Sequence, residues 1–236
     1  MGSYGEAAAY YDLLYAFKDY QAEATAIAEL IRDRGALGKR VLDVACGTGE
    51  HARHLTALGF HVDGIDIEPA FVDRAASKNP SGTFRTGDMA DFDIEDRYDA
   101  VVCLFSAIGY VQTVDRLNSA VRCMAAHLCP GGVAVVEPWF GPGDLTDGWI
   151  NMTTGENEEI KVARLSRTVL AGSTSRLEFE YLIGRASGLE RRSETHELGL
   201  FRQEEMTEAF QKAGLAVEHI PGSLRNRGLY VGRAEA

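Results

Sequence analysis

The sequence predicts an α/β protein with a doubly wound, mainly parallel sheet and a small antiparallel sheet inserted late in the chain. Two observations lead to this prediction. From residue 20 to about residue 139, short apolar runs alternate with segments of helical periodicity, which is the pattern of βα units. Between residues 140 and 200 no amphipathic helix of normal length is visible, and polar and apolar residues alternate instead, as in half-buried strands.

The stretch VLDVACGTGEHARHL, residues 41–55, reads as strand, tight turn and helix. The strand covers Val41 to Ala45, and Gly47 and Gly49 follow it before the helix. Glycine adopts backbone angles closed to other residues and lets a ligand come close to the main chain. A lone pair of glycines would indicate only a turn, but the residues around this one favour a ligand seat.

Three predicted strands end in carboxylates, and these indicate the kind of ligand. Asp43 stands beside the glycine turn, Asp66 ends the second strand, and Asp88 ends the third. Asp43 would repel a pyrophosphate and attract a sulfonium or ammonium group. Asp66 is placed to accept two hydrogen bonds from a ribose diol, and Asp88 would lie near an adenine amino group. Because ligands of such sheets bind at the carboxyl ends of the strands, the set favours S-adenosylmethionine.

The remaining elements follow from periodicity and from helix-breaking residues. A helix of residues 20–35 leads into the first strand, and a fourth strand within residues 98–110 ends in a loop from Ser106 to Tyr110. After it we expect a helix over 114–128, the breaker CPGG, and a fifth strand, VAVVEPWF. The end of the chain predicts a helix closed by Gly214 and two further strands, AVEHIPG and RGLYVGRA.

The predicted insertion divides the chain into a Rossmann-like part, residues 1–139 and 201–236, and an antiparallel part, residues 140–200. In SRLEFEYLIG the polar residues Arg176, Glu178 and Glu180 alternate with apolar ones. The apolar face consists of Leu177, Phe179, Tyr181 and Ile183. We expect this sheet to cover the active site or to contact another subunit.

Composition limits the partners of this protein. The chain has 236 residues, a formal net charge of -11 and a pI near 5.0. Nucleic acids and anionic membranes require a basic surface, so neither is an expected partner. The four cysteines lack metal-type spacing and no signal segment is recognised at the start, which predicts a cytoplasmic protein with reduced thiols and no metal site. His51 and His54 lack a third ligand and are expected to be solvated helix residues.

Several motifs together resemble one enzyme family. DVACGTG, GIDIEP and GDMADF are similar to the cofactor motifs of class I, Rossmann-like methyltransferases with a seven-stranded sheet. YYDLLY, KDYQAEA, FSAIGY, EPW, DGW and RGLYVG further resemble the N,N-dimethyltransferases of nucleotide-linked (TDP) amino sugars of the desosamine and mycaminose type. The resemblance spans nearly the whole chain. It implies an S-adenosylmethionine-dependent N-methyltransferase of antibiotic sugar biosynthesis, which is often a homodimer.

The resemblance also assigns roles to matching positions. Tyr11 and Tyr20 match tyrosines that hold the methionine part of the cofactor, Tyr4 and Tyr110 match positions beside the acceptor amine, and Arg227 matches a nucleotide contact. The full set of expected cofactor-binding residues is Tyr11, Tyr20, Asp43, Ala45, Gly47, Gly49, Asp66, Ile67, Asp88, Met89 and Leu104. The expected substrate-binding residues are Ser106, Trp139, Arg176 and Arg227. One departure is Phe140, where relatives have a second tryptophan after EPW.

Only a free amine can attack a methyl group, so the acceptor must lose a proton in or before the site. Candidates for the proton acceptor are His196, Tyr110, Tyr4 and Glu137. The alternative is orientation by tyrosine hydroxyls with loss of the proton to water. Trp139 could instead be a core or interface residue, and Arg176 could face solvent rather than substrate.

Three other functions compete with the amino sugar assignment. One is a small-molecule N- or O-methyltransferase with a different acceptor. Another is a nicotinamide-dependent oxidoreductase, because Gly47-x-Gly49-x-x-Ala52 satisfies the loose dinucleotide fingerprint. Asp43 and the lack of a recognisable Ser-Tyr-Lys set argue against it. The last is a noncatalytic subunit that binds the cofactor without turnover.

Overall fold

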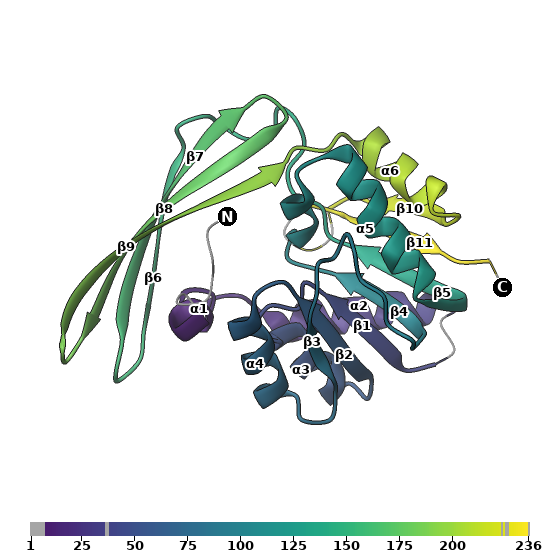
Figure 1. Cartoon of the computed structure of the whole chain (residues 1–236), viewed down its shortest axis with the longest axis horizontal. Helices are drawn as coiled ribbons and strands as arrows, with labels where there is room; N and C mark the ends of the chain where they lie inside the picture. Colours follow the sequence, from purple (N-terminus) through teal and green to yellow (C-terminus); the bar gives the residue numbers. More distant parts are fainter. Residues whose placement is uncertain (1–7, 36–37, 223, 225–226, 236) are drawn as a thin grey trace.

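The computed structural model describes residues 8–35, 38–222, 224 and 227–235, and these residues form two sheets (Figure 1). The larger sheet has seven strands in the order β10-β11-β5-β4-β1-β2-β3. Its strands are β1 (Arg40–Val44), β2 (His61–Asp66), β3 (Phe84–Thr86), β4 (Tyr98–Cys103), β5 (Leu128–Val136), β10 (Ala216–Ile220) and β11 (Leu229–Arg233). Only β11 runs antiparallel to its neighbours in this sheet. The predicted Rossmann-like class is confirmed.

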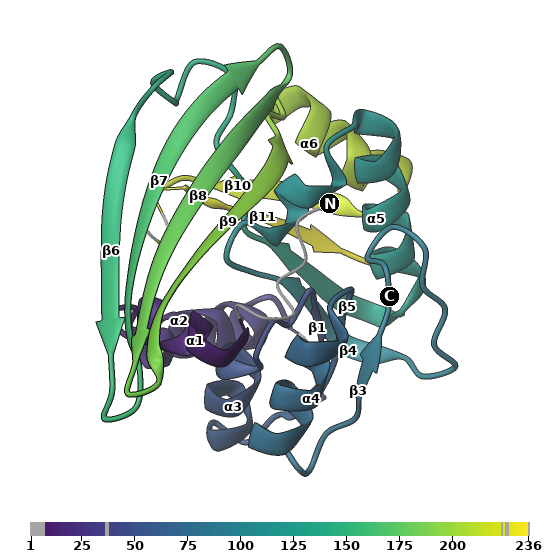
Figure 2. The ribbon, with the colours of Figure 1, turned by 60° about the vertical axis from the view of Figure 1, so that its left-hand side comes forward.

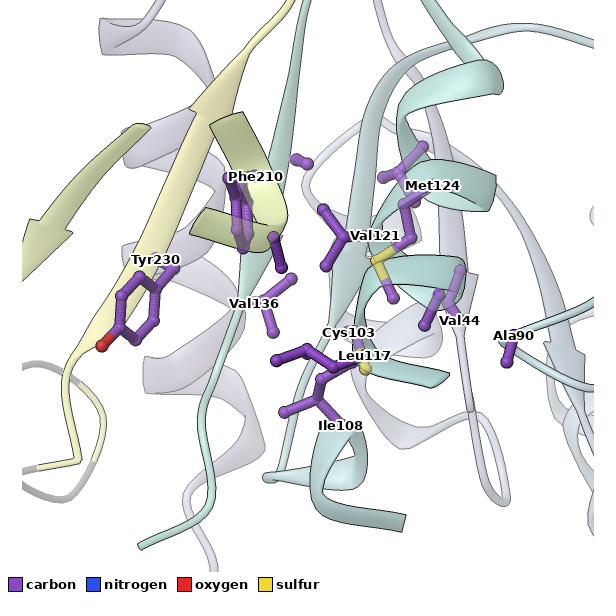
Figure 3. Close-up of a cluster of buried hydrophobic side chains, with 14 of the residues drawn as sticks. Val44, Ala90, Cys103, Ile108, Leu117, Val121, Met124, Val136, Phe210 and Tyr230 are labelled. Carbon is purple, nitrogen blue, oxygen red and sulfur yellow. The ribbon is translucent and has the colours of Figure 1, made fainter. Parts of the chain in front are cut away.

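Helices cover both faces of this sheet and bury a core on each side. They are α2 (Tyr20–Asp33), α3 (Glu50–Ala57), α4 (Pro69–Lys78), α5 (Val114–Ala126), α6 (Gln203–Lys212) and the short 3-10 helix η1 (Ala107–Val111). The short helix α1 (Ala8–Leu14) packs instead on the second sheet. On one face, α5 and α6 pack Met124 and Phe210 against strand residues such as Val136 (Figure 3). On the other face, α2 and α3 pack Ile27 and Leu55 on the same strands. None of the helices in the described ranges has the length and apolar character needed to span a bilayer.

One predicted boundary is wrong. CPGG does not form a loop between helix and strand, because α5 already ends at Ala126 and β5 begins at Leu128. The pairing of β4 with β5 shifts register between Tyr98 and Ala100, so the strand absorbs the proline and glycines as an irregularity. A Cβ on Gly132 would lie 2.9 Å from the Cys129 carbonyl oxygen, which explains why glycine is needed there.

The second sheet has four antiparallel strands in sequence order: β6 (Ile150–Glu156), β7 (Lys161–Ala171), β8 (Thr174–Arg185) and β9 (Gly188–Gly199). The expected antiparallel insertion is therefore present, and the alternating segment SRLEFEYLIG lies in β8. This sheet stands beside the α/β layers with one face turned toward them (Figure 2). On that face, Phe179, Tyr181 and Ile183 form an apolar cluster with Tyr10 and Leu14 of α1.

Candidate active site

In the turn after β1, Gly47 and Gly49 are required for different structural reasons. Gly47 has φ 55° and a Cβ there would meet nothing within 4 Å, so the backbone borders open space. Gly49 has φ 78° and a Cβ would lie 2.9 Å from Ala75 of α4, so it allows α3 and α4 to pack closely. Ala45, just before the turn, also has a positive φ of 58°. The turn is thus a strained cradle that is open at Gly47.

Two buried carboxylates stand at this turn. Asp66 accepts hydrogen bonds from the backbone N–H groups of Gly47 (2.8 Å) and Glu68 (2.9 Å), whereas Oδ2 of Asp43 has no hydrogen-bond partner among the described residues. Burial, with the nearby Asp66, raises the pKa of Asp43 to about 8, and burial also raises the pKa of Asp66. A cationic group placed here would relieve the cost of the buried Asp43 carboxylate.

The third predicted carboxylate is already paired. Both oxygens of Asp88 accept hydrogen bonds from Arg116 (2.9 and 2.7 Å), and one also accepts from the N–H of Ala90. Burial raises the pKa of Asp88, but the hydrogen bond from Arg116 outweighs it and leaves that pKa below the ordinary value. Of the apolar candidates near it, Ile67 is exposed while Leu104 is buried. The Asp88 side chain is therefore held rigidly at the end of β3.

The aromatic candidates of the N-terminal region converge on the same end of the sheet. The Tyr11 ring lies 4.7 Å from that of Tyr15 and 5.0 Å from that of Phe71. Burial raises the pKa of Tyr11, and Asp66 adds a smaller contribution in the same direction. Burial likewise raises the pKa of Tyr20. Both phenols keep their protons at neutral pH and remain hydrogen-bond donors.

An ionic cluster beside Tyr20 was not predicted from the sequence. Lys18 is only 5% exposed, pairs with Glu23, and lies 3.2 Å from Nε2 of His51, which is 2.9 Å from Glu23. The Lys18 ammonium also stacks on the ring of Phe105 at 4.7 Å. The expectation that His51 is solvated is wrong, because α2 packs over α3 and buries it. Helical periodicity does not indicate that a lysine such as Lys18 is buried, because it records only apolar positions.

A second set of predicted residues meets where β4 and β5 end. Ser106 has a left-handed φ of 60°, donates to the Pro138 carbonyl (2.6 Å) and accepts from Arg227 (2.6 Å). The Arg227 guanidinium lies over the rings of Trp139 (5.0 Å) and Phe140 (4.9 Å). Trp139 in turn donates its indole N–H to Ser175 of β8. Thus three of the four predicted substrate residues, Ser106, Trp139 and Arg227, form one cluster.

Glu137 lies beneath this cluster. It is buried, accepts the N–H of Phe105 at 2.6 Å, and is 3.6 Å from Arg227. Burial raises the pKa of Glu137, with Arg227 acting in the opposite direction. Its contacts fix the loop after β4, which carries two consecutive non-glycine residues, Phe105 and Ser106, at positive φ.

The candidate proton acceptors Tyr110 and His196 meet across the two sheets. The Tyr110 hydroxyl of η1 lies 3.4 Å from Nδ1 of His196 on β9, and Nε2 of His196 lies 3.3 Å from Glu194. His196 is only 3% exposed. Tyr110 lies in η1, which follows the end of β4, the strand next to β1 in the sheet.

Two predicted residues are not brought to this site. Arg176 lies on the face of β8 opposite Phe179 and Tyr181 and pairs with Glu178 at 3.1 Å. Tyr4 lies outside the described residues. Within the described ranges, no group of three or more His, Cys, Asp or Glu residues could hold a metal ion.

S-adenosylmethionine fits the residues present. The open backbone at Gly47 accommodates close approach, the unpaired oxygen of buried Asp43 suits a cationic ligand, and the exposed Ile67 side chain next to Asp66 offers an apolar contact. The cradle, carboxylates and tyrosines all lie where parallel strands end, which is where this sheet type binds ligands.

Comparisons with known proteins relate this chain to methyltransferases. Residues 41–132 match the family model of a methyltransferase domain. The chain is 40% identical over 225 residues, 94% of its length and 95% of the relative's, to the dTDP-3-amino-3,4,6-trideoxy-alpha-D-glucopyranose N,N-dimethyltransferase of Streptomyces venezuelae. It is 37% identical, over 94% of its length and 90% of the relative's, to the dTDP-4-amino-2,3,4,6-tetradeoxy-D-glucose N,N-dimethyltransferase of Saccharopolyspora spinosa.

A solved structure extends the likeness to a cofactor complex. The SAM-bound structure of CalS10, an amino pentose methyltransferase from Micromonospora echinaspora involved in calicheamicin biosynthesis, has a TM-score of 0.82 to this chain. The two chains are 38% identical, and the match covers 92% of each.

Proposed function

The chain belongs to the dTDP-amino sugar N,N-dimethyltransferases, S-adenosylmethionine-dependent enzymes, and on that basis we propose that it adds two methyl groups to the amine of a dTDP-linked amino deoxysugar. The observation that carries the acceptor assignment is the extent of the match. The methyltransferase domain model ends at residue 132, whereas the curated relatives match 94% of the chain, including the sheet β6–β9. That sheet contributes His196 and Ser175 to the clusters described above.

The cofactor side of the site has a division of roles. Bound S-adenosylmethionine supplies an electrophilic methyl group on a positively charged sulfur. In this proposal Asp66 accepts hydrogen bonds from the ribose hydroxyls, Asp43 attracts positive charge, and Tyr11 and Tyr20 donate to the methionine end. Gly47 lets the backbone approach the ligand, and Ile67, Met89 and Leu104 supply apolar contact around the adenine.

The acceptor side is formed by the Arg227 cluster and by Tyr110. Arg227, held by Ser106, offers a fixed positive charge to the diphosphate-linked nucleotide, and the neighbouring Trp139 and Phe140 rings offer flat apolar surface to a base. Tyr110 belongs to η1, which directly follows Ser106, and its hydroxyl lies 3.4 Å from Nδ1 of His196. Holding the amine in line with the methyl group supplies much of the rate, because a displacement depends on proximity and alignment.

We further propose that the protein is a homodimer of the cytoplasm. The outer face of β6–β9 exposes Ile150, Met152, Leu165 and Leu182, and Met152 and Leu165 are directly paired across β6 and β7. An exposed apolar patch on a regular sheet is suited to a second copy of itself. All four cysteines are free, which is compatible with a reducing compartment.

The test is mass spectrometry of dTDP-linked 3-amino and 4-amino deoxysugars after incubation with the protein and S-adenosylmethionine. We expect a gain of two methyl masses on one regioisomer. Relatives for both amine positions are about equally similar to this chain, so the experiment also assigns the amine position. Cofactor binding without a mass gain on either sugar would contradict the amino sugar assignment and favour another methyl acceptor.

A further inference from the structure

A hydrogen-bonded chain connects Tyr110 to the inside of the inserted sheet. Tyr110 contacts Nδ1 of His196 at 3.4 Å, Nε2 of His196 lies 3.3 Å from Oε2 of Glu194, and the same oxygen accepts the Tyr181 hydroxyl at 3.0 Å. The side chain of Glu194 is 9% exposed and that of His196 is 2% exposed. Burying polar groups is unfavourable unless they hydrogen-bond to one another, so these side chains form one hydrogen-bonded network.

The contacts determine which nitrogen of His196 carries a proton. A carboxylate can only accept hydrogen bonds, so the imidazole must present N–H at Nε2 toward Glu194. Nδ1 is then a lone pair directed at the Tyr110 hydroxyl. Tyr181 stays a donor to Glu194, because burial and then Glu194 itself raise the pKa of the Tyr181 phenol.

Aromatic and cationic side chains of β7, β8 and α1 lie around His196 and Glu194. On β8, Phe179 stacks on the imidazole at 5.0 Å, and on β7 the Arg164 guanidinium stacks on Phe179 at 4.6 Å. Arg164 donates a hydrogen bond to the Tyr15 hydroxyl at 2.9 Å and also hydrogen-bonds Tyr181. On α1, burial and then Glu194 raise the pKa of Tyr10 to about 12, so this phenol is neutral.

The position of Tyr110 relative to β9 is tightly fixed. Its neighbour Gly109 packs so closely that a Cβ there would lie 2.9 Å from Trp139 and 3.0 Å from Leu198 of β9. Gln112, at the end of η1, donates to the backbone carbonyl of Glu197 at 3.2 Å. The loop that presents Tyr110 is thus attached to the same strand that carries His196 and Glu194.

We propose that Glu194 is a positioning residue for methyl transfer, which orients His196 so that Tyr110 and His196 together remove the proton of the acceptor ammonium. The ammonium gives its proton to the Tyr110 oxygen as the Tyr110 proton passes to Nδ1 of His196. The free amine forms the C–N bond while the C–S bond breaks. His196 releases its proton to water that enters when the product leaves, and the second methylation repeats the cycle. This inference rests on the function proposed above.

The experiment compares the wild type with Glu194→Gln, Tyr110→Phe and Tyr181→Phe across pH, using the dTDP-amino sugar that the wild type methylates. At pH 7 we expect kcat to fall roughly 10- to 100-fold in E194Q and Y110F, within the range of general base catalysis. In Y181F, kcat at pH 7 should fall by about threefold. As the pH rises toward about 10, where an alkyl amine loses its proton unaided, the variants should converge on the wild type. The affinity for S-adenosylmethionine, measured by calorimetry, should not change.

The matched control is Glu197→Gln, the same chemical change on the outward face of β9, which should keep wild-type kcat at every pH. The proposed proton transfer would be overturned if the ratio of wild-type to E194Q kcat were the same at all pH values. It would also be overturned if E194Q and E197Q had the same kcat. If E194Q does not fold, Y110F and Y181F alone decide by the same pH criterion. If the wild type were inactive on every amino sugar, both the proposed function and the proposed proton transfer would be overturned. If the wild type were active and the variants had unchanged kcat, only the proposed proton transfer would be overturned.

Discussion

At the scale of single residues, the neighbouring carboxylates Asp43 and Asp66 differ in their hydrogen bonds. Asp66 is satisfied by two backbone N–H groups, whereas Asp43 is 1% exposed with an oxygen that no described residue serves. The pKa of Asp43 rises from 3.8 to about 8 because burial, and then Asp66, disfavours its charge. The buried Asp43 carboxylate therefore lowers the stability of the folded protein, as is common for residues of functional sites.

Replacing Asp43 by Asn should stabilise the cofactor-free protein above pH 8 and weaken cofactor binding. The folded-state pKa is raised, so the penalty of a charged Asp43 is absent below about pH 4 and complete above about pH 8. Removing it should stabilise by about 2 kcal/mol, or roughly 4–8 °C in Tm for a chain of this size. Thermal denaturation from pH 4 to pH 9 measures the difference, with the exposed Asp33→Asn as control. A Tm gain that is independent of pH would contradict this account.

At the scale of elements, α1 is attached to the cofactor turn through one side chain. Asp12 accepts from the Thr48 hydroxyl of the glycine turn (2.5 Å) and from Lys78 of α4 (2.6 Å), and Lys78 also pairs with Glu50 of α3 (2.8 Å). Because Tyr11 adjoins Asp12, these contacts determine where that phenol lies. A seven-residue helix has little stability of its own, so tertiary contacts must hold it.

The Asp12→Asn variant should therefore bind S-adenosylmethionine about five- to tenfold more weakly, which corresponds to about 1–1.4 kcal/mol. The loss arises because the amide no longer holds Lys78 by charge and α1 becomes less firmly attached. Calorimetric titration with the cofactor measures it. Asp73→Asn, the same change at an exposed position of α4, is the control. Equal affinities of D12N and D73N would show that α1 needs no such attachment.

At the scale of the whole molecule, the inserted sheet has two different faces. One buries Phe179, Tyr181 and Ile183 against α1 and the active site, while the other exposes an apolar patch around Met152 and Leu165. The seven-stranded sheet provides the cofactor cradle, and the four-stranded sheet contributes His196 and Glu194. The two faces let this sheet complete the site on one side while it remains available for subunit contact on the other.

Light scattering after gel filtration should give twice the chain mass of 25.7 kDa for the wild type. Introducing charge in the patch, as in Met152→Glu with Leu165→Glu, should produce monomers because burying a carboxylate at an interface is unfavourable. Leu58→Glu, at an exposed position on the other sheet's helix layer, should leave the dimer intact. A monomeric wild type would rule out the proposed assembly.

Local pattern was enough to predict much of this fold and part of its site. The alternation of βα units predicted the main sheet, and the glycine turn with Asp43 and Asp66 predicted the cofactor cradle. The irregular start of β5 and the strands β6 and β7 were not recognised, because a proline in a strand and weak alternation contradict the usual preferences.

By itself, the sequence determined which chemistry is available: the cradle, its carboxylates and the apolar faces are encoded by residues close together in the chain. Only the tertiary structure decided which side chains meet. Tyr110 and His196 are 86 residues apart, and Arg227 and Ser106 are 121 apart. It also turned Arg176 away and buried Lys18 with His51. Periodicity records which face of an element is apolar, but the packing of one element on another decides which polar groups share a site.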